Sequence, residues 1–164
     1  MKFIKIAAIT ALTALFFTSC SNDDVTSPAE LPLGSYDNGA LILNQGNFGT
    51  PNSSMSYLSD DLGKFQDDIF KIVNPSETLG DTGQDLGFYG NKAYIVLNNS
   101  NKIEVVNRYT MKHITSITLG LSNPRYIAFY NGKGYVTNWG DGGSSTDDFV
   151  AVINLNSNTV SATI

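Results

Sequence analysis

The feature that most constrains the fold of this sequence is an internal repeat of short apolar segments. Residues 89–96 align with residues 130–137 at an offset of 41, and residues 103–107 align with residues 150–154 at an offset of 47. The difference of six residues is a loop insertion within residues 140–148. A repeat of about 40–45 residues made of short strands is typical of a β-propeller blade. The sequence therefore predicts an all-β fold of blades, each with four antiparallel strands.

The expected strands are rich in β-branched and aromatic residues and are bounded by Gly, Asn, Asp and Ser. In the second unit they are residues 86–89, 93–97, 102–107 and 113–119. In the third unit they are residues 126–129, 134–138, 149–155 and 160–164. The first unit offers only residues 40–44, 55–59 and 69–73, so we expect about three blades, the first without its innermost strand. No segment shows sustained helical periodicity.

The N-terminus has the pattern of an export signal. Lys2 and Lys5 precede an apolar run over residues 6–17, which is too short to span a membrane. Residues 17–20, Phe-Thr-Ser-Cys, resemble the lipobox of bacterial lipoproteins, in which the cysteine is diacylated and becomes the mature N-terminus. We therefore expect a signal peptide over residues 1–19 and, over residues 20–37, lipidated Cys20 and a flexible tether. A plain secreted protein with an incidental cysteine is the alternative.

The charge of the mature chain limits its partners. Removal of residues 1–19 leaves eight basic and 15 acidic residues, a net charge of −7. Such a chain is not expected to bind nucleic acid or anionic lipid, so its membrane contact is expected only through the acyl anchor. Asp23 and Asp24 resemble the acidic export signals of some Gram-negative surface lipoproteins, although a solvated tether explains them equally well. The expected location is the cell envelope, on the outer membrane and at the cell surface.

The third unit also carries a family resemblance. Residues 135–138 read Tyr-Val-Thr-Asn, and with residues 150–154 and 158–164 they are similar to one YVTN-type repeat. That family contains bacterial seven-bladed propellers related in shape to the quinoprotein amine dehydrogenase heavy chain. The resemblance covers residues 39–164, within a partial propeller expected over residues 38–164. Because fewer than about four blades do not close a ring, we expect this sequence to be the N-terminal part of a longer protein or a truncated reading frame, and a small self-standing β-domain is the alternative. Residues 43–49 and 96–105 resemble a subset of surface lipoproteins, some of which capture corrinoids.

The order of strands in such a blade predicts where a ligand would bind. The loop entering the innermost strand and the loop joining the second and third strands share one face. Amides and exposed aromatic rings gather in these loops, and they suit sugars, corrinoids or peptides. The candidate ligand-binding residues are Gln45, Asn47, Phe48, Gln84, Asn98, Asn99, Arg125 and Trp139. The alternative is that the asparagines fill turns and that Trp139 fills a gap between blades.

The sequence offers little support for catalysis. Its single histidine, His113, falls on an outermost strand and is expected to be a surface or edge residue. No cluster has the spacing of a zinc site, and no nucleophile with a base is visible, so we expect no metal, no cofactor and no enzymatic activity. A surface lipoprotein that captures a small extracellular ligand is the first hypothesis. A structural propeller that partners an outer-membrane transporter or another surface protein is the second, and a quinoprotein-type enzyme subunit is the third.

Overall fold

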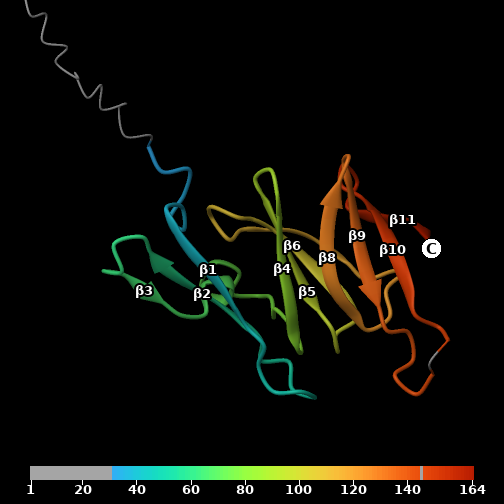
Figure 1. The fold of residues 1–164 in the computed structure, drawn as a ribbon. Coiled ribbons are helices and arrows are strands. Elements are labelled where there is room, and N and C mark those ends of the chain that lie inside the picture. Colours follow the sequence, from blue (N-terminus) through green and yellow to red (C-terminus); the bar gives the residue numbers. More distant parts are fainter. Residues whose placement is uncertain (1–30, 145) are drawn as a thin grey trace, which may run out of the picture. The chain divides into compact units, whose positions relative to one another are not determined.

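The computed structural model describes residues 31–144 and 146–164 of the chain. The expected signal peptide, Cys20 and most of the expected tether lie outside these residues. The described chain forms three antiparallel sheets and one short helix (Figure 1). None of its helices is both long enough and apolar enough to cross a membrane.

The second and third sheets repeat the same four-stranded pattern. The second contains β4 (Gly83–Tyr89), β5 (Lys92–Leu97), β6 (Lys102–Asn107) and β7 (His113–Ile117), in that spatial order. The third contains β8 (Pro124–Tyr130), β9 (Lys133–Asn138), β10 (Phe149–Asn154) and β11 (Thr159–Thr163), again in sequence order.

The registers confirm the repeat that the sequence predicts. Tyr94 pairs with Val105 in the second sheet, and Tyr135 pairs with Val152 in the third. These are the residues that the two sequence offsets relate to each other. The prediction of an all-β fold with four-stranded antiparallel blades is therefore confirmed.

The first sheet has three strands, β1 (Gly39–Asn44), β2 (Ser54–Ser59) and β3 (Phe65–Gln66). Strand β1 lies against β4 in the way that β5 lies against β8. Because β5 is the second strand of its sheet, β1 also takes the second position. Within residues 31–144 and 146–164, the innermost strand of this first blade is missing, as the sequence predicts.

One expected strand is wrong. Residues 69–73 form the helix α1 (Ile69–Val73), and β3 supplies the last strand of the first sheet instead. Ile69 and Phe70 are buried, and Val73 is packed against the same core. A short apolar run fits a buried strand and a helical turn equally well, so the pattern alone does not distinguish them. The helix ends at Asn74, whose backbone angles are not helical (φ −122°, ψ 70°) and whose side-chain amide donates to the Phe70 carbonyl oxygen at 2.9 Å.

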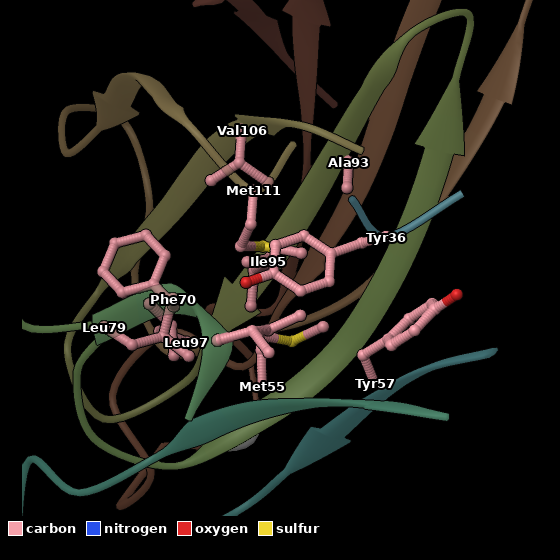
Figure 2. Packing of buried hydrophobic residues seen from close by; sticks show 11 residues of the cluster. Tyr36, Met55, Tyr57, Phe70, Leu79, Ala93, Ile95, Leu97, Val106 and Met111 are labelled. Atoms are coloured by element: carbon pink, nitrogen blue, oxygen red, sulfur yellow. The ribbon is translucent and has the colours of Figure 1, made fainter. Parts of the chain in front are cut away.

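Two apolar clusters join the three sheets. Figure 2 shows the first, in which Met55 and Phe70 from the first unit meet Ile95 and Leu97 of β5. Tyr36 belongs to this cluster and is only 6% exposed, and its backbone N–H donates to the Tyr109 carbonyl oxygen at 2.9 Å. The flexible tether expected to reach residue 37 therefore ends earlier, because burial and this hydrogen bond fix Tyr36.

The second cluster lies between the second and third sheets. It contains Tyr94 and Val96 of β5 together with Val136 of β9, with Phe129 packed at its edge. Asp85 adds a direct link between these sheets, because its Oδ2 accepts the backbone N–H of Ile127 at 2.8 Å. The second and third sheets are thus joined by apolar packing and by polar links that include this carboxylate.

Candidate functional site

Hydrogen bonds bring the candidate loops to one end of the three sheets. The Gln45 carbonyl oxygen accepts the backbone N–H of Gly83 at 3.0 Å, which joins the first sheet to the second. Asn98 donates its backbone N–H to the Thr82 carbonyl oxygen at 2.9 Å. Its side-chain amide donates to the Pro124 carbonyl oxygen at 3.1 Å, which joins the second sheet to the third. The structure thus places these loops side by side at the same end of the three sheets.

The strongest feature at this end is the pair formed by Arg125 and Trp139. The guanidinium carbon of Arg125 lies 3.8 Å from the centroid of the Trp139 ring, in cation–π geometry. Trp139 is 52% exposed, and its backbone N–H donates to the Asn123 carbonyl oxygen at 3.1 Å. Within the described part of the chain, Arg125 Nε is buried and has no hydrogen-bond partner.

A cavity of about 410 Å³ opens beside this pair. Tyr126 and Phe149 add two further aromatic rings to its wall, and Asp148 adds a carboxylate. A second cavity of about 310 Å³ adjoins the first and shares Trp139 and Asp148 with it. The two cavities form a groove that combines aromatic surface with one cation and one anion, a composition suited to a polar ligand with an apolar face.

Asn98 and Asn99 have structural partners. Asn98 is 6% exposed and holds the Pro124 carbonyl oxygen, as described above. Asn99 donates its side-chain amide to Asp81 Oδ2 at 2.6 Å. Both side chains hold neighbouring loops in place, and neither lines the Arg125–Trp139 cavity.

The remaining four candidates do not line the Arg125–Trp139 cavity. Phe48 is 76% exposed at the tip of the β1–β2 loop, and Gln45 and Asn47 are exposed in the same loop. The backbone N–H of Asn47 donates to Asn52 Oδ1 at 2.8 Å, which closes the loop on itself. Gln84 is half-buried at the start of β4. The structure thus brings Arg125 and Trp139 together and leaves these four residues at other points of the same end.

The structure also contains a charged cluster around His113 that the sequence pattern did not predict. Nε2 of His113 lies 3.0 Å from Glu104 Oε2, and Nδ1 lies 3.0 Å from Glu77 Oε2. Glu104 is 2% exposed. It also accepts a hydrogen bond from the Ser116 hydroxyl at 2.6 Å and forms an ion pair with Lys102. His113 lies on the outermost strand β7, as the sequence predicts, and there it is a half-buried bridge between two carboxylates.

One signal could have pointed to this cluster. Glu104 stands on an inward-facing position of β6, where a carboxylate requires partners. Of the other members of the cluster, His113 and Ser116 lie on the neighbouring strand β7. Ser116 donates its hydroxyl proton to Glu104 Oε2 at 2.6 Å, and its Oγ also lies 3.2 Å from His113 Nε2. No group of three or more His, Cys, Asp or Glu residues suited to a metal ion occurs in residues 31–144 and 146–164.

Comparisons with known proteins agree with this architecture. Among solved structures, hydrazine synthase from Kuenenia stuttgartiensis is similar, with a TM-score of 0.60 and 16% sequence identity. The match covers 77% of this chain and 34% of that chain, so this sequence spans about a third of the other's length. At this identity the likeness shows a β-propeller-like fold and nothing of function. No curated protein matches this sequence. A family model described as a domain of unknown function, DUF5074, matches residues 38–164, and the chain therefore belongs to the DUF5074 family.

Proposed function

We propose that this protein is a non-catalytic surface lipoprotein whose propeller-like blades bind an extracellular ligand in the Arg125–Trp139 groove. The observation that carries the proposal is the stack of Arg125 on the half-exposed Trp139 ring, beside a cavity of about 410 Å³. A stacked guanidinium is held in position before a ligand arrives, so little conformational entropy is lost on binding.

The composition of the groove suggests the class of ligand. The rings of Trp139, Tyr126 and Phe149 offer flat apolar contact, while Arg125 donates hydrogen bonds and Asp148 accepts them. A corrinoid or a glycan has both an apolar face and many hydrogen-bonding groups. The guanidinium also favours a ligand that carries a phosphate or carboxylate, such as a corrinoid with its nucleotide loop.

The N-terminal sequence supports the location. An export signal followed by Cys20 fits a protein held at the outer membrane by an acyl chain, and the acidic body fits a protein with no other membrane contact. A ligand-capture role at the cell surface requires both a binding groove and an anchor. Uptake of the captured ligand would then involve an outer-membrane transporter as a partner.

Isothermal titration calorimetry on the lipid-free mature protein tests the proposal. The ligands are cobalamin, cobinamide and a glycan panel, and the variants are Arg125→Ala and Trp139→Ala. Because an aromatic or arginine hot spot contributes about 2 kcal/mol or more, each variant should weaken binding by about 30-fold. Tyr130→Ala is the control, because Tyr130 is a 74% exposed aromatic residue on β8 that does not line the groove. Affinities unchanged in both groove variants would contradict the site assignment.

A role in protein interaction is the second candidate. Tyr126 and Tyr130 are 55% and 74% exposed and lie four residues apart on β8, so they project from the same face of the strand. Exposed aromatic side chains are enriched at protein interfaces. If this role is the correct one, Tyr130→Ala should weaken co-purification of a transporter or surface protein, whereas Trp139→Ala should not.

A further inference from the structure

Another cavity, of about 410 Å³, lies away from the groove, between the start of the first sheet and the β6–β7 turn. Its wall consists of residues 36–41, Phe88 at the end of β4, and Arg108 and Tyr109 in the turn. It shares no residue with the Arg125–Trp139 groove.

Arg108 is the positive group of this cavity. Its guanidinium carbon lies 4.6 Å from the ring centroid of Phe88 and 5.2 Å from that of Tyr109. The backbone N–H of Arg108 donates to the Asn91 carbonyl oxygen at 3.0 Å, which fixes the backbone at this residue. In residues 31–144 and 146–164, no carboxylate forms an ion pair with the guanidinium. The planar group therefore lies near two aromatic rings, and no ion pair engages its donors.

Asp37 is the negative group. Its Oδ2 accepts the backbone N–H of Leu33 at 2.8 Å, and its Oδ1 accepts that of Asn38 at 3.0 Å. These bonds fix the carboxylate and leave lone pairs on both oxygens, since an ionised carboxylate has about four acceptor sites. Asp37 and Arg108 line the same cavity but form no ion pair with each other. The wall of the cavity thus contains one acidic and one basic residue that are not paired with each other.

We propose that this cavity binds a free amino acid as its zwitterion. The α-carboxylate takes the planar donor fork of Arg108, where a bidentate pair is favoured, and the α-ammonium takes Asp37. The rings of Phe88 and Tyr109 contact the ligand side chain, which favours an aromatic or large aliphatic amino acid. A simple anion would meet the Asp37 carboxylate and a simple cation would meet Arg108, so each is disfavoured.

Matched ligands test the proposal on the unmodified mature protein. L-Phenylalanine and L-leucine are titrated by calorimetry and by amide chemical shifts of residues 36–41, 88 and 108–109. L-Phenylalaninamide lacks the carboxylate, and N-acetyl-L-phenylalanine lacks the ammonium group. We expect L-phenylalanine to bind and each analogue to bind about tenfold more weakly or worse, because each loses one charged contact. No shift at these residues with either amino acid would overturn the proposal, as would equal binding of the analogues.

Variants separate this cavity from the groove. Arg108→Ala and Asp37→Asn should each weaken L-phenylalanine binding by about tenfold or more, and Arg108→Lys should also weaken it because lysine lacks the planar fork. Arg125→Ala is the matched control, and it should leave amino-acid binding unchanged while affecting the groove. Binding that survives Arg108→Ala, or that is lost in Arg125→Ala, would overturn the assignment. The analogue titrations need no variant, so they decide the question even if a substitution prevents folding.

Discussion

Tyr94 and Tyr135 occupy the same register position in consecutive sheets, but only Tyr94 is fully buried. Tyr94 pairs with Val105 and is 0% exposed, and its hydroxyl donates to Asn158 Oδ1 at 2.8 Å. Tyr135 pairs with Val152 and is only partly buried. The difference arises because the third sheet packs over Tyr94. These two tyrosines are therefore a matched pair for measuring what packing between blades contributes to stability.

We expect Tyr94→Phe to lower the free energy of unfolding by about 1 kcal/mol, because it removes a buried hydrogen bond. Tyr94→Ala should lower it by about 3–5 kcal/mol, because it also leaves a cavity. Tyr135→Phe should change it by less than about 0.5 kcal/mol, as is usual for positions that solvent reaches. Urea unfolding of the three variants provides the measurement. Equal losses for Tyr94→Phe and Tyr135→Phe would contradict this account of the blade contact.

The same residue predicts a dependence on alkaline pH. Burial, with a smaller contribution from Tyr89, raises the pKa of Tyr94 from 10.0 to about 12. The folded state therefore binds the phenolic proton more tightly than the unfolded state does. The stability that this provides is complete below pH 10 and is lost as the pH rises toward 12. Between these values, wild type should lose roughly 2–3 kcal/mol more stability than Tyr94→Phe, measured as unfolding free energy against pH.

Gly87 should not tolerate alanine. A Cβ at this position would lie 2.7 Å from side-chain atoms of both Ile127 and Phe129, across the contact between the second and third sheets. We expect Gly87→Ala to cost about 1–3 kcal/mol of stability through overpacking, and Phe129→Leu in the same chain to recover part of it. Gly142→Ala is the control, since a Cβ added at Gly142 would meet no atom within 4 Å. If the stability losses of Gly87→Ala and Phe129→Leu simply add in the double variant, the Cβ at position 87 does not clash with Phe129.

The fold could be predicted from the sequence wherever a residue has a counterpart in the neighbouring repeat. Tyr94 and Tyr135 share both a register and a sequence motif, so the offsets identified their strands correctly. Residues 69–73 have no such counterpart, and their apolar pattern alone did not separate a strand from the helix α1. Tyr36 was missed as a core residue because the turn-like sequence around it gave no sign of its bond to Tyr109.

The candidate site was predictable only in part. Strand order brought the loops of Arg125 and Trp139 to one end of the sheets, but the 3.8 Å stack depends on side-chain geometry that no spacing encodes. The His113 cluster was missed for a related reason. Glu77 comes from an irregular segment 36 residues before His113, and its approach depends on how α1 packs. The Arg108 cavity likewise joins segments that are distant in sequence.

Cys20 should carry the membrane anchor. The basic residues, the apolar run and the Phe-Thr-Ser-Cys sequence together predict diacylation of this single cysteine. Metabolic labelling with a fatty-acid analogue should mark wild type and leave Cys20→Ala unlabelled, and the variant should lose its membrane fraction. Equal labelling of both proteins would contradict the lipoprotein assignment without affecting the fold.

The stack between Arg125 and Trp139 should be measurable as a coupling energy. A cation–π contact at a partly exposed site contributes about 0.5–1 kcal/mol, so a double-mutant cycle on Arg125→Ala and Trp139→Leu should give a coupling in this range. Trp139 is the only tryptophan, so its fluorescence reports directly on the groove. Arg125→Ala should shift the emission of Trp139, whereas Arg108→Ala should not, because Arg108 stacks on Phe88 instead. If both variants shift the emission equally, the change reflects the fold as a whole. If neither does, the guanidinium is not held on the indole ring, and the preorganised cation on which the proposed ligand site depends is absent.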